Sequence, residues 1–277
     1  MRIQMIALDL DGTVLRNDKS ISPRTLETLK QAAQMGVRIV PATGRVAKMV
    51  PEELLRLPGA RYILTSNGAN VIDMKNHSTV YSRTMTAAAS LRLIRFLTER
   101  GLFAEAYTGG VSYSDSALLR QLFKFNLPEQ FFQFIRASQT LVDNLPAFLE
   151  QQGALLEKVN IPYLPKKEKQ FLAEEIPAMG PYSVTSSGYQ NLEINAVHAS
   201  KGDGLLHLCQ VLGMERDRVM AFGDGDNDRT MLRFAGLGVA MGNAEPDLFG
   251  VADEVTDTNE EDGVAKAVEK YVLSQPD

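Results

Sequence analysis

A run of apolar residues that ends in two carboxylates constrains this chain more than any other feature. Residues Ile3 to Leu8 are rich in strand formers, and Asp9, Asp11 and Gly12 follow them. Such a run is typical of a strand buried on both faces of a parallel sheet. Because side chains alternate along a strand, Asp9 and Asp11 should point the same way. Two close carboxylates repel each other unless a cation or proton lies between them, although a strand ending in a polar turn would also explain the pattern.

The same rhythm of strand, turn and helix recurs on both sides of a long middle segment. Ser22-Pro23 predicts the start of a helix that ends near Gly36. Strands are predicted over residues 37–40 and 61–65, with a hairpin over 69–82, and the spacing predicts right-handed crossovers into a parallel sheet. From Lys201 onward we expect further strands and helices of the same kind, with strands over 218–222, 237–241 and 254–256.

From about Met85 the pattern changes to short strands mixed with helices. Five phenylalanines between Phe123 and Phe134 predict a second small core rather than a ligand-stacking surface. We therefore expect an α/β protein with a doubly wound, parallel-sheet (Rossmann-like) core formed by residues 1–82 and 191–277. A smaller α+β domain formed by residues 83–190 should be inserted into it.

The charge and composition of the chain argue against nucleic-acid and membrane partners. The 277 residues carry a net charge of −5 without any run of Lys and Arg, which argues against a nucleic-acid surface. An anionic substrate would then need local positive charge. No stretch reaches the roughly 18 apolar residues of a membrane helix. The single Cys209 excludes an internal disulfide, and no signal peptide is evident, so we expect a cytoplasmic protein without a membrane partner.

Four polar clusters follow predicted strands: residues 9–13, 43–45, 67–68 and 224–228. The carboxyl ends of parallel strands share one edge, so the clusters should converge there. Carboxylates, water and substrate phosphate are the ligands that Mg²⁺ prefers. Lys201 is either a solvated helix-start lysine or the counter-charge of the carboxylates, and the second interpretation is favoured beside them. Arg45 could clamp phosphate or pair with a carboxylate, and His198 could face the site.

The acidic cluster from Asp224 to Asp228 imitates two other motifs. An EF-hand loop would need Gly where Arg229 stands and Glu where Ala235 stands. A dinucleotide fingerprint would need a third Gly and no carboxylates beside the pyrophosphate. Asp228 could also serve as a helix N-cap. Three carboxylates in five residues exceed what capping needs, so a cation site is favoured.

Together these clusters resemble a known family. Asp9-Leu-Asp11-Gly-Thr13, Thr43-Gly-Arg45, Lys201 and the run Gly223 to Asp228 stand in the order of the four motifs of haloacid dehalogenase-like (HAD) phosphohydrolases. The insert resembles the α/β (type C2) cap of the Cof-type branch. The tail segments 240–244 and 259–265 also resemble that branch. His198-Ala199-Ser200 and Pro41 depart from that branch's usual residues.

The resemblance implies a Mg²⁺-dependent phosphatase that hydrolyses a small phosphorylated metabolite, such as a sugar phosphate or phosphorylated cofactor, through an aspartyl phosphate. It implies that Asp9 is the nucleophile, that Asp11 is the general acid and base, and that Lys201 neutralises the developing charge. The residues implied to bind phosphate are Thr43, Gly44, Lys201 and Asn227. Those implied to bind the metal are Asp9, Asp11 (through its carbonyl), Asp224 and Asp228. Asp226 receives no role.

There are three rival interpretations. A signalling receiver that keeps its phosphoryl group would need far fewer residues and no inserted domain, and a non-catalytic binder is disfavoured because every motif carboxylate is present. A phosphosugar mutase on the same scaffold is the third. Substrate choice should lie in the insert, from about Tyr81 to Gln190, because the core clusters serve only the phosphoryl group. The insert is expected to join the core near residues 81–86 and 187–192, so it could hinge as a lid. The sequence names neither the substrate nor the oligomeric state.

Overall fold

The computed structural model describes residues 2–188 and 190–274, which form two compact units. The core unit contains the residues up to Ser82 and from Ser200 onward, and the inserted unit is Arg83–Ala199. The second crossing between units therefore lies later than the expected 190–191. The reason is strand β11 (Leu192–Ala196), which pairs with two strands of the inserted unit. Tyr189, in the expected connection, lies outside the described residues.

The core unit is built on a parallel sheet of five strands in the order β14-β13-β12-β1-β2. Their bounds are Glu254–Val255, Leu237–Ala240, Val219–Gly223, Met5–Leu8 and Arg38–Pro41. Strand β1 lies between β12 and β2, and all four of its residues are fully buried, as its apolar run predicts. Strand β1 therefore delivers Asp9 to the carboxyl edge of the sheet.

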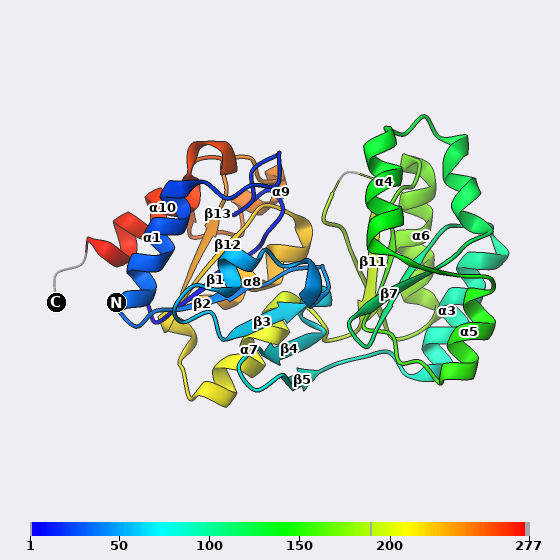
Figure 1. Cartoon of the computed structure of the whole chain (residues 1–277), viewed down its shortest axis with the longest axis horizontal. Coiled ribbons are helices and arrows are strands. Elements are labelled where there is room, and N and C mark those ends of the chain that lie inside the picture. The colour runs from blue at the N-terminus through cyan, green and yellow to red at the C-terminus, as the bar shows by residue number, and fades with distance from the viewer. Residues whose placement is uncertain (1, 189, 275–277) are drawn as a thin grey trace. The chain divides into compact units, whose positions relative to one another are not determined.

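Helices cover both faces of this sheet (Figure 1), which confirms the doubly wound fold. Ile6 and Leu8 of β1 face one core, which α1 and α10 complete, whereas Met5 and Ala7 face the other, which α7 and α8 complete. The helices and turns of this unit are α1 (Pro23–Gln34), η1 (Ala47–Met49), α2 (Glu52–Leu55), α7 (Lys201–Leu212), η4 (Arg216–Arg218), η5 (Asp226–Asp228), α8 (Arg229–Phe234), α9 (Pro246–Phe249), η6 (Asn259–Glu261), α10 (Gly263–Val268) and the π-turn η7 (Glu269–Leu273).

The third predicted strand does not extend the parallel sheet. Strand β3 (Tyr62–Thr65) pairs antiparallel with β4 (Asn70–Asp73), and β4 pairs with β5 (Ser78–Ser82). Its link to β2 is one parallel bridge, Ala42 to Leu64. The N–H groups of Arg38 and Ala42 point to β1, so the position of Pro41 faces β3. Proline has no N–H, and the ladder loses a bond there.

The inserted unit contains a mixed sheet of six strands in the order β10-β11-β9-β6-β7-β8. The other strands are β6 (Glu105–Thr108), β7 (Val111–Asp115), β8 (Thr140–Val142), β9 (Lys158–Ile161) and β10 (Tyr182–Thr185). Three helices lie on one side of this sheet (Figure 1): α3 (Ala87–Glu99), α5 (Leu145–Gln152) and α6 (Lys166–Met179). The unit is thus α+β, as predicted.

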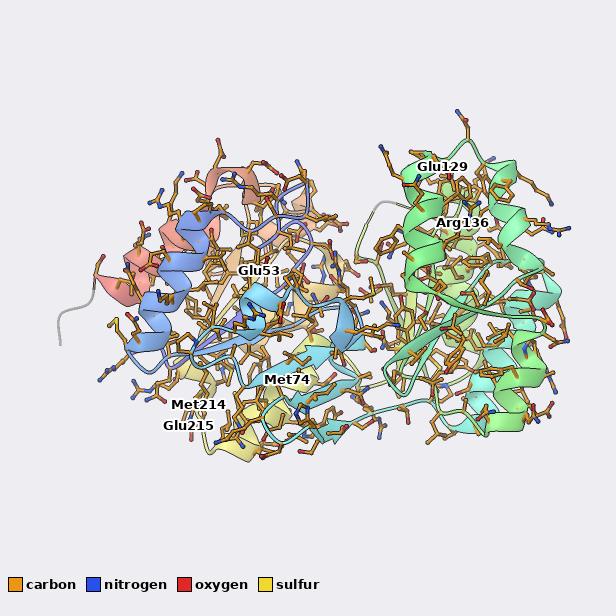
Figure 2. The ribbon with its side chains drawn as sticks, in the orientation of Figure 1. Glu53, Met74, Glu129, Arg136, Met214 and Glu215 are labelled. Carbon is orange, nitrogen blue, oxygen red and sulfur yellow. The ribbon has the colours of Figure 1, made fainter. Side chains whose placement is uncertain are left out.

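The aromatic segment of the insert forms a small core in part. Phe132 of α4 (Glu129–Ser138) is buried with Phe103, and η3 (Leu118–Lys124) packs against them through buried Leu122. Phe123 and Phe134 are half exposed, so the prediction of one aromatic core holds for only some of these side chains. On the outer face of α4, Glu129 and Arg136 form an ion pair of 3.5 Å (both labelled in Figure 2).

In the described ranges, no helix combines the length and the apolar character needed to cross a membrane.

Gly68 brings the turn after β3 against the start of α7. Its φ is +84°, and a Cβ added there would lie 2.3 Å from the Ser200 carbonyl oxygen and 2.9 Å from the Lys201 Cα. Backbone atoms cannot rotate away from such a contact as the end of a side chain can. Gly68 therefore fixes how closely Lys201 approaches the edge of the sheet.

We predict that Gly68→Ala destabilises the protein more than Gly36→Ala. Gly36 has a similar φ of +87° and open space around its Cα, so its substitution should cost only the left-handed strain of about 1–2 kcal/mol. The clash at Gly68 should add about 1–3 kcal/mol. Chemical denaturation of the two variants measures the difference, and equal losses would contradict the close approach.

Candidate active site

Asp9 lies at the carboxyl end of β1 and faces a buried lysine. Its N–H donates to the carbonyl of Phe222 on β12 at 3.1 Å, which continues the sheet ladder by one residue. The Lys201 Nζ lies 2.5 Å from Asp9 Oδ1 and 2.6 Å from Asp228 Oδ1. Lys201 is wholly buried, so its charge depends on these two carboxylates. Burial opposes this charge, but Asp228 and Asp9 outweigh it and raise the pKa of Lys201.

Helix α7 holds Lys201 in place from its first turn. Ser200 is the N-cap and forms a capping box with Asp203: the Ser200 hydroxyl accepts from the Asp203 N–H at 3.2 Å, and the Ser200 N–H donates to the Asp203 carboxylate at 3.2 Å. This arrangement satisfies two backbone donors at the helix start. The lysine is thus the counter-charge that the sequence favoured, not a solvated surface residue.

Asp228 organises the loop that follows β12. Its Oδ2 accepts hydrogen bonds from the N–H groups of Asp224 and Gly225 at 2.9 and 3.0 Å. A Cβ on Gly223 would lie 2.3 Å from the Asp228 Cβ, so a larger residue does not fit there. Asp228 therefore combines an anchoring role for the loop with its ion pair to Lys201.

Asp9, Asp224 and Asp228 could hold a metal ion, because one carboxylate oxygen from each lies within 4.8 Å of the other two. Burial and the charge of Asp228 raise the pKa of Asp9 well above its usual range and that of Asp224 to about 7. Lys201 supplies one positive charge against three carboxylates. The oxygen ligands and this excess of negative charge fit a hard divalent cation.

Asp11 does not join these carboxylates through its side chain. The Arg45 guanidinium donates to both of its oxygens, from Nε at 2.7 Å and from Nη2 at 2.5 Å, and Lys19 Nζ lies 2.8 Å from Oδ1. Burial raises the pKa of Asp11, but these two cations outweigh it and hold the pKa below its usual value. Of the two roles considered for Arg45, the structure shows pairing with a carboxylate.

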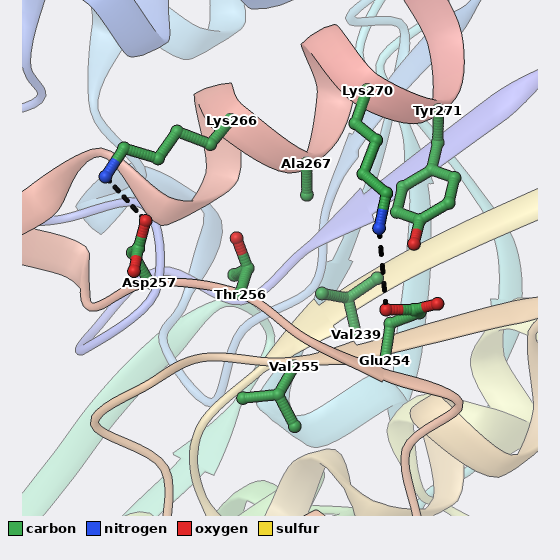
Figure 3. Close-up of a pocket in the computed structure, with 9 residues that line it drawn as sticks. All are labelled: Val239, Glu254, Val255, Thr256, Asp257, Lys266, Ala267, Lys270 and Tyr271. Atoms are coloured by element: carbon green, nitrogen blue, oxygen red, sulfur yellow. Dashed lines mark hydrogen bonds and ion pairs between the residues drawn. The ribbon is translucent and has the colours of Figure 1, made fainter.

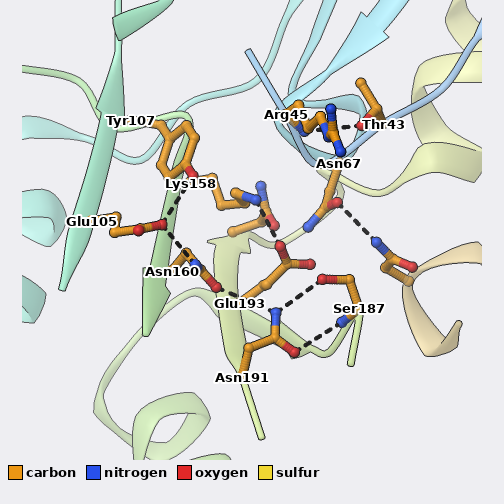
Figure 4. A network of polar contacts seen from close by, with 12 residues as sticks. Thr43, Arg45, Asn67, Glu105, Tyr107, Lys158, Asn160, Ser187, Asn191 and Glu193 are labelled. Carbon is orange, nitrogen blue, oxygen red and sulfur yellow. Dashed lines mark hydrogen bonds and ion pairs between the residues drawn. The ribbon is translucent and has the colours of Figure 1, made fainter. Parts of the chain in front are cut away.

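Thr43 and Arg45, which follow β2, lie against the turn that follows β3. Thr43 Oγ1 accepts from the Arg45 N–H at 3.1 Å, and its carbonyl accepts from the Asn67 N–H at 3.0 Å (Figure 4). Asn227 Nδ2 donates to Asn67 Oδ1 at 3.2 Å. Ser66, Asn67 and Gly68 have φ values of 52°, 61° and 84°. Two adjacent non-glycine residues in the left-handed region are costly, and such strain is concentrated at functional sites.

Several supporting contacts were not evident from sequence. Thr13 donates to Asp224 Oδ1 at 2.9 Å. Asn243 Nδ2 donates to the Gly12 carbonyl at 2.8 Å, and Asn243 Oδ1 accepts from the Asn259 N–H at 3.0 Å. Asn243 and Asn259 stand in the tail segments that resemble the Cof-type branch, which was the only signal for them. Lys19, the second partner of Asp11, carried none.

A separate hollow of about 240 Å³ lies beside β14 (Figure 3). Its lysines already have acidic partners: Lys266 Nζ lies 2.5 Å from Asp257, and Lys270 Nζ lies 3.8 Å from Glu254. Residues of β13, β14, α10 and η7 contribute to its lining, together with Thr256 and Asp257. It is therefore distinct from the strand-end cluster around Asp9.

Comparison with known proteins agrees with the sequence motifs. A model of the haloacid dehalogenase-like hydrolases matches residues 6–268. A 5-amino-6-(5-phospho-D-ribitylamino)uracil phosphatase of Bacillus subtilis is 28% identical over 271 residues, covering 98% of this chain and 96% of the relative. A phosphoglycolate phosphatase of Methanobrevibacter smithii is 28% identical over 278 residues, covering 99% and 100%.

A solved structure of a haloacid dehalogenase-like hydrolase from Bacillus subtilis matches with a TM-score of 0.85 at 26% identity, covering 96% of this chain and 99% of that one. The match extends over the core unit and the inserted unit alike. With the family model spanning nearly the whole sequence, this chain belongs to the haloacid dehalogenase-like hydrolases.

Proposed function

We propose that this protein is a Mg²⁺-dependent phosphatase that hydrolyses a small phosphorylated metabolite through an aspartyl phosphate on Asp9. The observation that carries the proposal is the buried contact of Asp9 with Lys201, beside Asp224 and Asp228 at the carboxyl edge of the sheet. The family is one of hydrolases, and the two relatives described above are named as phosphatases.

In the proposed reaction, a carboxylate oxygen of Asp9 attacks the phosphorus atom while the bond to the leaving oxygen breaks. Asp11 gives a proton to that oxygen, and the alcohol departs. Asp11 then takes a proton from water, whose oxygen attacks the aspartyl phosphate and releases inorganic phosphate. Lys201, Thr43, the Gly44 amide and Asn227 are assigned to the phosphoryl oxygens, where positioning and charge stabilisation supply most of the catalysis.

A bound Mg²⁺ would supply positive charge that lets a carboxylate approach an anionic phosphoryl group. Asp9 and Asp224 are the assigned side-chain ligands, with the Asp11 carbonyl. Asp228 is assigned to supporting that shell, since its oxygens already bond Lys201 and the loop N–H groups.

Asp11 is a carboxylate in the arrangement described here, because Arg45 and Lys19 stabilise its charge. That form suits the second step, in which it takes a proton from water. The first step requires the opposite form, so Asp11 must gain a proton beside the substrate. The bidentate contact with Arg45 fixes the orientation of the carboxylate for both steps.

The first prediction tests the nucleophile. Asp9→Asn should remain folded, because the buried Lys201 keeps Asp228 as its counter-charge, and should lose phosphate release completely. The measurement is inorganic phosphate released from a panel of phosphorylated metabolites and p-nitrophenyl phosphate, with circular dichroism to check folding. Substantial turnover by the variant would refute the role, and wild-type transfer of phosphate without its release would favour the mutase alternative.

A second prediction tests the metal. Mg²⁺ at about 100 times its dissociation constant should stabilise the wild type by about 2.7 kcal/mol, because it binds only the folded state. Asp224→Asn should lose most of this gain in thermal denaturation. Asp226→Asn is the matched control, because Asp226 lies in the same loop but pairs with Arg229 at 3.0 Å. Equal Mg²⁺ responses in both variants, or full activity in excess EDTA, would contradict the assignment.

The third prediction concerns Arg45. Arg45→Met should lower kcat on alkyl phosphates about tenfold or more, up to the ~10²–10⁴ that proton transfer contributes in full, and change p-nitrophenyl phosphate hydrolysis little. That leaving group needs no proton. Arg45→Lys should restore only part of the loss because Lys lacks the planar fork.

The control for Arg45 is Lys19→Met, which removes the more exposed partner of Asp11. It should have a smaller effect on both substrates, since exposed ion pairs contribute little. Equal losses on alkyl and nitrophenyl phosphates in Arg45→Met would instead assign Arg45 to phosphate binding, the other role that the sequence left open.

A further inference from the structure

The loop that follows β1 is held by side chains from the far end of the chain. Asn243 Nδ2 donates to the Gly12 carbonyl at 2.8 Å, although 231 residues separate the two. Asn259 Nδ2 donates to the Leu15 carbonyl at 2.9 Å in a buried contact. Asn243 Oδ1 accepts from the Asn259 N–H at 3.0 Å, which joins the two side chains. The two asparagines together form a bracket on residues 12–15.

The chemistry of the primary amide suits Asn243 to this place. An amide offers donors and an acceptor on one short side chain, whereas an ionised aspartate can only accept. Asn243 uses both functions, since it donates to one backbone segment and accepts from another. Asn243 is also exposed and belongs to neither apolar core of the unit. Its hydrogen bonds therefore order the loop and do not serve the packing of the core.

The bracketed loop lies directly against a carboxylate of the candidate metal site. Gly12 has a φ of +79°, and a Cβ added to it would overlap Asp224 Oδ2. The next residue, Thr13, donates from its hydroxyl to Asp224 Oδ1 at 2.9 Å. The Asp11 carbonyl belongs to the peptide bond that precedes Gly12. A displacement of Gly12 would therefore disturb both Asp224 and the Asp11 carbonyl, the two groups assigned to the cation on this side of the loop.

Two weaker contacts continue along the loop from the same tail segment as Asn259. The Asn17 N–H donates to Glu260 Oε1 at 2.7 Å, and Arg16 Nη2 lies 3.1 Å from Asp262 Oδ1. The first contact is exposed and the ion pair is partly so. Exposed polar pairs contribute little to stability, so the two asparagines supply most of the support.

We propose that Asn243, anchored by Asn259, is a positioning residue that holds Gly12 against Asp224 and so strengthens the binding of the divalent cation. It acts through Gly12 and not by contact with the cation or the substrate. The inference rests on the proposed phosphatase function, because that function supplies the need for a metal. Residues that orient metal ligands from behind typically change metal affinity or activity ~10–100-fold when they are substituted.

The test follows the melting temperature of the full-length protein through a Mg²⁺ titration, which gives an apparent dissociation constant without turnover. Asn243→Ala should raise that constant about tenfold. Its hydrolysis of p-nitrophenyl phosphate should fall at limiting Mg²⁺ and recover, at least in part, at saturating Mg²⁺. Asn76→Ala is the matched control, because Asn76 is also exposed and donates from Nδ2 to Asp73 at 2.9 Å between β4 and β5. It should leave the Mg²⁺ constant unchanged.

A lower melting temperature of Asn243→Ala with an unchanged Mg²⁺ constant, or equal constants in Asn243→Ala and Asn76→Ala, would overturn the inference and leave the phosphatase proposal intact. A wild type whose melting temperature and hydrolysis of p-nitrophenyl phosphate do not respond to Mg²⁺ would instead refute the Mg²⁺-dependent phosphatase.

If Asn243→Ala does not fold, Asn243→Asp takes its place. This variant keeps the acceptor for the Asn259 N–H and loses the donor to Gly12. Its added negative charge would by itself favour a cation. Weaker Mg²⁺ binding than in the wild type would therefore support the positioning role, and equal or tighter binding would overturn it.

Discussion

The core unit depends on one buried cation that touches two carboxylates. Lys201 is wholly enclosed, and its ammonium group is satisfied by Asp9 from β1 and Asp228 from the loop after β12. Removing Lys201 would leave both carboxylates buried without compensation, and breaking a buried pair in this way typically costs about 3–5 kcal/mol. The same contact therefore stabilises the fold and orders the proposed nucleophile. Lys201 supplies only one positive charge, so Asp9, Asp224 and Asp228 together still leave an excess of negative charge, which a divalent cation would relieve.

The convergence of polar clusters could be predicted from sequence because it follows from topology. A parallel sheet brings the carboxyl ends of its strands to one edge, so Asp9 and the loop after β12 had to meet once the strands were recognised. The third strand could not be placed in the same way. Its residue pattern predicted a strand correctly. However, Pro41 has no N–H to donate to β3, and the tight turn at residues 66–68 leads β3 into antiparallel pairing with β4.

The sequence could not predict which of two equivalent partners a charged side chain would contact. Arg45 had a phosphate or a carboxylate available, and only the rotamers and the position of η1 decide for Asp11, since Arg45 also donates to the Met49 carbonyl at 3.2 Å. Lys19 pairs with Asp11 from a position where its own φ is 68°, a conformation that the residue type does not predict. The sequence does indicate which residue types lie near the edge, but not which of them pair.

One face of the inserted unit's sheet carries the polar residues Glu105, Lys158, Asn160 and Glu193. Their arrangement shows a different limit of prediction from sequence. Each strand alternates apolar and polar residues, so a polar face could have been anticipated from any one of them. Its chemistry depends on register between strands that are distant in sequence, which places Glu105 opposite Asn160, 55 residues later, and Asn160 opposite Glu193, 33 residues later. Shifting one strand by a residue would bury its polar set against the helices. The apolar packing of Ala106, Val159 and Ile194 therefore sets the register, and the register in turn determines which donors and acceptors the polar face presents.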